Sequence, residues 1–374
     1  MIDLSDISIV DHHAHPLSRA GATAEADAFR RWFSESTDAE IHCRHVPNTL
    51  FFRTAVHWLA EELHCAPALE DVLKARAAID YEGWTKKLFT QANIQQLYCD
   101  YGYSGELAYS HEEMKALLPC DVRPILRLET LAEDLIRLHE TFEEMVADFA
   151  QRVSRAKRDG YVALKSIIAY RSGLAIVPTG KDLARNRFGD LKNAAMRNRR
   201  FRLTDKAFND YLIWLALDVS EEQGLPLQFH TGFGDRDADL LKANPLNLRT
   251  VIEMTHAPFV LLHAGWPYYR EAAHLAAIYP HVWVDLSLAV PFATTGIPTM
   301  VRDVLGMAPF SKVMFATDAF TMPEIYWLAA RWGRWGLSRV LEEMVEDGFL
   351  AVDEAFDVAR QILGRNALAL YGEA

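Results

Sequence analysis

Short apolar runs separated by helix-like stretches recur along almost the whole chain, and this alternation constrains the fold more than any other feature. The first run leads into Ile9-Val10-Asp11-His12-His13-Ala14-His15. Later runs are nearly continuous in apolar residues, which is typical of strands covered by helices on both faces. Eight strands alternating with helices predict an α/β fold, a (β/α)8 TIM barrel. After the first strand, the expected strands span 94–99, 122–128, 162–168, 226–230, 259–263, 283–287 and 313–318.

The stretches between these strands predict the helices. Residues 17–92 hold helical periodicity and no convincing strand, so we expect a helical insertion there, after strand 1. Farther on, the apolar period predicts one long amphipathic helix over 131–157 and two separate helices over 324–332 and 337–345. Barrels of this class reach this length with insertions, so residues 1–374 are expected to form a single barrel domain.

Polar residues stand where several of these strands end, and active sites of such barrels lie at the carboxyl ends of the strands. Each residue alone has a structural interpretation, such as a hydrogen-bonded core histidine or a helix cap. Together they predict one divalent metal site at the barrel mouth. Within the first strand, alternation places Asp11, His13 and His15 on one face and His12 on the other. The candidate metal ligands are His13, His15, Lys165, His230, His263 and Asp318.

Composition restricts the partners. The formal net charge of -12 argues against a nucleic acid or an anionic membrane as a partner, so we expect a small-molecule substrate. The four cysteines have no paired spacing and no apolar run is long enough to span a bilayer. With no signal-peptide pattern at the start, these features predict a cytoplasmic protein. The sequence is silent on whether the chain forms a homo-oligomer.

The candidate ligands resemble those of the amidohydrolase superfamily, whose pattern is His-x-His on strand one, Lys or Glu on strand four, His on strands five and six, and Asp on strand eight. The tail from Ala359 to Ala367, with Leu370-Tyr371, is similar to the closing helix of the amidohydrolase-2 branch. The stretch from Lys165 to Leu174 resembles the amidohydrolase-like half of nodulin and fluG-type proteins. The resemblance is specific for the fold and the metal site and weak for the substrate.

This resemblance implies a metal-dependent hydrolase that cleaves an amide, or a lactone or ester, in a small carboxylate-bearing substrate with a metal-activated water. His13, His15 and Asp318 would hold the first metal, with His230 completing a mononuclear site. Zn²⁺ suits such ligands, with Mn²⁺ or Fe²⁺ as alternatives. Asp318 would accept the proton of the water as general base.

Lys165 decides between one and two metal ions. As a carbamate, it would bridge two metals, and His230 and His263 would hold the second. As an ammonium, it would pair with Glu129 or Asp285. In a mononuclear site His263 would instead orient water or substrate.

Four further residues are candidate substrate contacts at the same mouth: Arg127, Tyr170, Arg171 and Trp266. A guanidinium binds a carboxylate through two parallel hydrogen bonds, although Arg171 could equally pair with Asp235 or Asp237. Trp266 could wall the pocket or pack beneath it. The functional alternatives are a metal-dependent non-oxidative decarboxylase, which usually lacks the strand-four lysine, a sugar-acid isomerase, and a barrel without catalysis.

Overall fold

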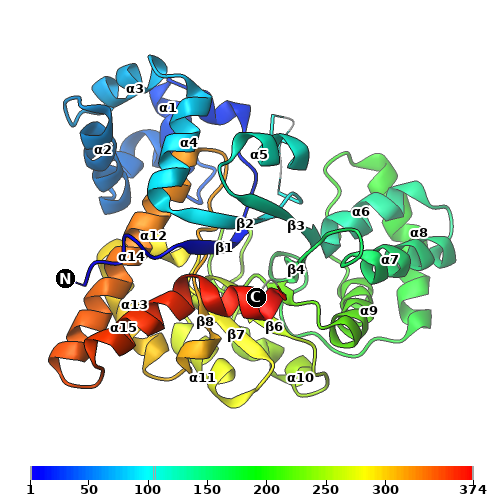
Figure 1. Ribbon diagram of the computed structural model, residues 1–374. Helices are drawn as coiled ribbons and strands as arrows, with labels where there is room; N and C mark the ends of the chain where they lie inside the picture. Colours follow the sequence, from blue (N-terminus) through cyan, green and yellow to red (C-terminus); the bar gives the residue numbers. More distant parts are fainter. Residues whose placement is uncertain (1, 104, 106, 373–374) are drawn as a thin grey trace.

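The computed structural model describes residues 2–103, 105 and 107–372, and its centre is a parallel sheet of eight strands. The strands follow one another around the sheet in sequence order, as the alternation of strands and helices predicts (Figure 1). They are β1 (Ile9–Ala14), β2 (Ile94–Asp100), β3 (Asp121–Arg127), β4 (Ala163–Ser166), β5 (Leu227–Phe229), β6 (Phe259–Leu261), β7 (Val282–Asp285) and β8 (Val313–Met314).

The segment after β8 brings the last strand back to the first. The backbone N–H of Asp318 donates to the carbonyl of His13 (3.0 Å), and that of His15 donates to the carbonyl of Ala319 (2.8 Å). Thr317 donates its N–H to the carboxylate of Asp11 (2.9 Å). The sheet therefore curls into a barrel, and the end of β1 lies directly beside residues 317–319.

Helices connect the strands and cover the sheet. Between β1 and β2 the chain forms α1 (Ala26–Arg30), α2 (Leu50–Leu63), α3 (Leu69–Ala77) and α4 (Tyr81–Ala92), which lie together in blue and cyan in Figure 1. From β2 to β5 the helices are α5 (His111–Leu117), α6 (Leu128–Leu138), α7 (Phe142–Arg155), α8 (Lys181–Arg197) and α9 (Lys206–Gln223). The later ones are α10 (Arg249–Ile252), α11 (Tyr269–Ile278), α12 (Ala289–Ala293), α13 (Ile297–Leu305), α14 (Pro323–Glu346), α15 (Val352–Arg360) and α16 (Asn366–Tyr371). None of the helices in the described ranges is both long enough and apolar enough to cross a membrane.

The single long helix expected over 131–157 is wrong, because the chain breaks there into α6 and α7. Thr141 caps α7: its hydroxyl accepts from the N–H of Glu144, whose carboxylate accepts from the N–H of Thr141. Such a capping box satisfies the free N–H groups of a helix start and so favours a new helix at this point.

The two helices expected over 324–332 and 337–345 are instead the one helix α14. Gly333 and Gly336 lie between the two expected helices, where glycine disfavours a helix interior, yet both lie inside α14 in close contacts. A Cβ on Gly333 would lie 2.3 Å from the ring of Phe315, and one on Gly336 would lie 2.3 Å from Ile297. The glycines let α14 approach the sheet and α13 and do not end the helix.

The C-terminal helix α16, at the red end of the chain in Figure 1, packs against β1 and β8. Ala367 and Tyr371 of this helix join a buried cluster with Val10, Tyr98 and Val260 of the strands. Apolar side chains therefore dominate this part of the interior, although the buried Gln228 and the hydroxyl of Tyr371 also lie here.

Candidate metal centre

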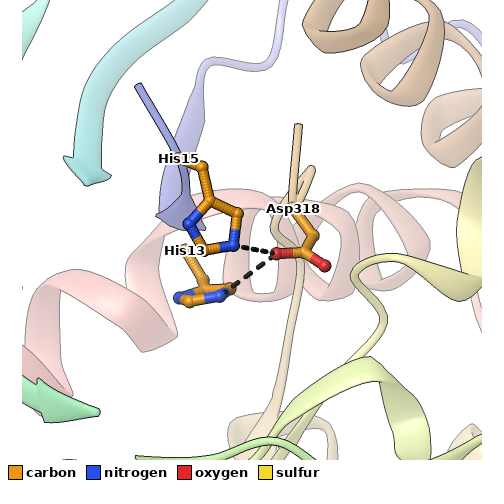
Figure 2. A group of neighbouring side chains, drawn as sticks. All are labelled: His13, His15 and Asp318. Atoms are coloured by element: carbon orange, nitrogen blue, oxygen red, sulfur yellow. Dashed lines mark ion pairs between the residues drawn. The ribbon is translucent and has the colours of Figure 1, made fainter. Parts of the chain in front are cut away.

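His13, His15 and Asp318 converge on one point at the barrel mouth (Figure 2). The Nε2 atom of His13 lies 3.1 Å from Asp318 Oδ1, and the Nε2 atom of His15 lies 3.2 Å from the same oxygen. All three side chains are nearly or fully buried. Both histidines therefore reach the carboxylate, as expected for alternate residues of one strand.

Asp11 does not join them, although strand alternation predicts that it should share their face. The register of β1 against β2 shifts between Asp11 and Ala14, and Asp11 accepts hydrogen bonds from Thr317. His12 lies with its Nε2 atom 3.2 Å from Asp285 Oδ2. The irregular end of β1 thus presents His13 and His15 together while Asp11 ties the strand to residue 317.

The backbone of this site is held in uncommon conformations. Asp318 has φ 50° and His263 has φ 66°, both in the left-handed region that non-glycine residues seldom adopt. The N–H of His263 donates to Asp285 Oδ1 (2.6 Å), which fixes the turn after β6. Such conformations cluster at functional sites, where the surrounding structure holds them.

His230, His263 and Lys165 lie next to this cluster. His263 Nε2 lies 2.9 Å from His230 Nδ1, and His263 Nδ1 lies 3.6 Å from Asp318 Oδ2. Lys165 Nζ lies 3.2 Å from His13 Nε2. All six residues expected at the mouth are thus brought together, although only His13, His15 and Asp318 form a compact ligand set within the described ranges.

Burial keeps His13, His230 and His263 neutral, and the side chains around Asp318 keep it charged. Burial lowers the pKa of His13 to about 4, with Lys165 adding to the effect, and burial also lowers the pKa values of His230 and His263. Although burial opposes the charge of Asp318, the neighbouring His263, His13 and His15 hold its pKa well below its usual value. Neutral imidazoles and an ionised carboxylate are the forms that bind a cation.

The three side chains fit a divalent metal by geometry. Ligand atoms of a tetrahedral zinc ion lie about 3.3 Å apart, because each is roughly 2.0–2.1 Å from the metal. The two nitrogen-to-oxygen distances here, 3.1 and 3.2 Å, are close to that separation. His15 Nδ1 lies 3.1 Å from the carbonyl oxygen of Asp100, a contact that leaves Nε2 as the free ligand atom. Within the described residues the buried His230 Nε2 has no hydrogen-bond partner, but it lies outside the compact group of His13, His15 and Asp318.

Lys165 takes neither of the two acidic partners considered from the sequence. Glu129 accepts instead from Ser166 Oγ (2.7 Å) and from the N–H of Ile167 (3.0 Å), and Asp285 faces His12. Burial lowers the pKa of Lys165 to about 8, so the neutral amine is accessible near physiological pH.

A cavity of about 910 Å³ opens above the cluster and is lined by His15, Lys165, His230, His263 and Asp318. Of the four candidate substrate contacts, Arg127, Tyr170 and Arg171 also line it. The ring of Tyr170 lies 4.3 Å from that of His230. Trp266 is not among the lining residues and packs on Phe233 at 5.1 Å between ring centroids.

The two arginines have acidic partners. Arg127 Nη2 and Nε donate to Asp100 Oδ2 at 2.6 and 2.9 Å, so its charge is balanced below the cavity. Arg171 Nη2 lies 3.4 Å from Glu133 Oε1, and not beside Asp235 or Asp237, the two partners considered from the sequence. Asp237 pairs instead with Arg202.

Two acidic residues of the cavity, Glu133 and Glu35, are not identified by the sequence pattern. Glu35 follows α1 and the short helix η2 (Arg31–Phe33) and lines the cavity. Burial, with Asp318 and Asp235 nearby, raises its pKa to about 8. Its sequence neighbours give no signal for this role, since it becomes a cavity residue only when the connection between β1 and β2 folds over the barrel mouth.

Comparison with family models identifies one family. Residues 133–372 match the model of a family described as amidohydrolase. The alignment with Protein fluG of Emericella nidulans is 401 positions long and 30% identical. It covers 97% of this chain and 45% of fluG, so the chain spans less than half of that relative. A crystal structure from Lactobacillus casei ATCC 334, described as a candidate metal-dependent hydrolase, has a TM-score of 0.90 and 28% identity, covering 99% of this chain and 96% of that one. A uronate isomerase of Thermotoga maritima shares the fold, with a TM-score of 0.67 and 16% identity over 98% of this chain and 95% of its own.

Proposed function

Because the chain belongs to the amidohydrolase family, we propose that it is a metal-dependent hydrolase that cleaves an amide bond, or a lactone or ester, in a small carboxylate-bearing molecule. The observation that carries this proposal is the convergence of His13, His15 and Asp318 within 4.8 Å at the floor of a cavity large enough for a small substrate.

His13, His15 and Asp318 would hold the first metal, for which we propose Zn²⁺. A divalent metal held there supplies an activated water and polarises the carbonyl of the substrate. Asp318 accepts the proton of the attacking water and delivers it to the leaving group. Its second oxygen lies toward His263, 3.6 Å away, which orients the carboxylate for this transfer.

Lys165 leaves two versions of the site. The neutral form of a lysine amine can react with CO2, and the resulting carbamate would hold a second metal with His230 and His263. The lowered pKa of Lys165 and the free Nε2 atom of His230 support this version. Without the carbamate, His230 completes a mononuclear site and His263 orients the substrate.

The test combines metal analysis with an assay panel of N-acyl and ω-amides, lactones and aromatic carboxylates. We expect one or two equivalents of divalent metal per chain, with a mass gain of one CO2 on Lys165 accompanying two. Asp318→Asn should lower kcat for the best amide by about 10²–10⁴-fold, as expected for loss of a general base. The exposed Asp353→Asn is the matched control and should leave kcat unchanged.

Two results would contradict the proposal. Release of CO2 from the aromatic carboxylates, with no amide, lactone or ester cleaved, would identify a decarboxylase. Failure to bind metal, with Asp318→Asn equal to the wild type in every assay, would leave a barrel without this chemistry.

A further inference from the structure

We propose that Arg171, Arg200 and Arg202 form an anion subsite that binds a carboxylate of the substrate across the barrel mouth from His13, His15 and Asp318. The inference rests on the proposed function and names its substrate class: molecules whose scissile carbonyl and terminal carboxylate lie at opposite ends, such as the ω-amides of dicarboxylic acids.

The order of the strands separates the two ends of the cavity. His13, His15 and Asp318 lie on β1 and after β8, which are neighbours in the barrel. Arg171 follows β4 and the short helix η5 (Ile168–Tyr170), and Arg200 and Arg202 lie between α8 and α9 in the same connection. In an eight-stranded barrel β4 stands opposite β8, yet all three arginines line the cavity that contains His15 and Asp318.

Arg171 is built into the wall of the cavity with hydrogen-bonding capacity to spare. Its side chain is only 8% exposed, and among the residues that the structure describes its buried Nε has no hydrogen-bond partner and its one acidic contact is Glu133 at 3.4 Å. Burying a guanidinium with so few acceptors is unfavourable unless another group satisfies its remaining donors. A substrate carboxylate would be such a group, since guanidinium and carboxylate pair through parallel hydrogen bonds.

The same carboxylate connects Arg171 to the other two arginines. Glu133 Oε1 accepts from the N–H of Leu203 (2.8 Å), next to Arg202. The buried Phe201 anchors the segment between Arg200 and Arg202. These contacts position the segment 200–203 beside Arg171, so that the exposed Arg200 and Arg202 border the cavity at this end.

The balance of charge favours a carboxylate over a phosphate. Arg202 pairs with Asp237, and Arg171 shares Glu133, so three positive charges meet two negative ones. Asp235, on the connection after β5, lines the same cavity and opposes a second negative charge on the ligand. With Asp235 counted, three carboxylates offset the three arginines, so a monoanionic carboxylate meets less repulsion at this end than a dianionic phosphate does.

Isothermal titration calorimetry on the metal-loaded protein tests the subsite with glutarate, its neutral diamide and inorganic phosphate as probes. Arg171→Gln should weaken glutarate binding by about 10- to 100-fold, as expected for a lost charge-assisted contact, and leave diamide binding unchanged. The double variant Arg200→Gln/Arg202→Gln should weaken glutarate severalfold. Arg185→Gln, an exposed arginine of α8 that pairs with Glu143 and Asp182, is the control and should bind as the wild type does.

The proposal is overturned if Arg171→Gln binds glutarate as tightly as the wild type, or weakens glutarate and diamide equally. Should that variant fail to fold, the exposed double variant decides by the same comparison. Phosphate binding tighter than glutarate, and lost with Arg171, would overturn the assignment to a carboxylate. Because calorimetry needs no turnover, Arg171-dependent glutarate binding without amide hydrolysis would refute only the proposed reaction.

Discussion

Removing the hydroxyl of Tyr371 should destabilise the protein by about 2 kcal/mol, because this hydroxyl completes a buried polar chain beneath the metal centre. Gln228 Nε2 donates to the Tyr371 hydroxyl (2.8 Å), which lies 3.1 Å from His12 Nδ1, and His12 Nε2 lies 3.2 Å from Asp285 Oδ2. Apart from Tyr371, which is 7% exposed, these side chains are fully buried.

The magnitude follows from the groups that Tyr371→Phe leaves behind. Gln228 keeps a second acceptor, the carbonyl of His12 at 2.9 Å, so its loss is small. His12 Nδ1 has no other hydrogen-bond partner in the described ranges, and a buried nitrogen left without one costs roughly 1–3 kcal/mol. The phenyl ring keeps the packing of Tyr371 against Tyr98, so no cavity contribution is added.

Urea unfolding, followed by circular dichroism, measures the effect as a shift in midpoint at unchanged m-value. Tyr279→Phe removes a hydroxyl that donates to Glu253 at an exposed position and should cost less than about 0.5 kcal/mol. Equal free energies of unfolding for Tyr371→Phe and the wild type would refute the buried chain as a source of stability.

Two further outcomes follow from the site. In the metal-free protein, the His13 pKa of about 4 lies below its unfolded value of 6.5, so between these pH values the unfolded chain binds one more proton than the folded chain does. The contribution of His13 to stability should therefore be complete above pH 6.5 and fall by roughly 3 kcal/mol toward pH 4. His13→Gln should remove this part of the change in the urea midpoint. A Cβ on Gly234 would lie 1.7 Å from the Tyr170 hydroxyl, so Gly234→Ala should displace Tyr170 and lower kcat/KM roughly 10- to 100-fold. The control Gly189→Ala has open space around the added Cβ and should leave kcat/KM unchanged. Equal kinetics for the two variants would exclude a role for the position of Tyr170.

The order of strands and the six candidate ligands follow from the sequence because both are periodic or positional signals. A strand that is buried on both faces must be apolar, so the polar residue that ends it is conspicuous, as at His230 after β5. Parallel strands that succeed one another around a barrel bring their carboxyl ends to one mouth. His13 and Asp318 could therefore be placed together although 305 positions of the chain separate them.

Helix boundaries and pairings depended on contacts that no local pattern contains. Gly333 and Gly336 suggest a helix end in sequence, and only the approach of Phe315 and Ile297 makes them interior positions of α14. Lys165 faces His13, and not either acid considered for it, since Glu129 is already used by Ser166 and Ile167.

What the sequence determined by itself was the barrel and the composition of its polar mouth, because burial and strand order act on residue type and position alone. Tertiary structure decided which charges neutralise one another and which remain available to a ligand. Arg127 is satisfied by Asp100, whereas the Nε of the buried Arg171, beside the cavity, has no partner among the described residues. Two arginines that end or follow a strand thus differ in their hydrogen bonding, because a hydrogen bond depends on distance and direction in space, which the order of residues does not specify.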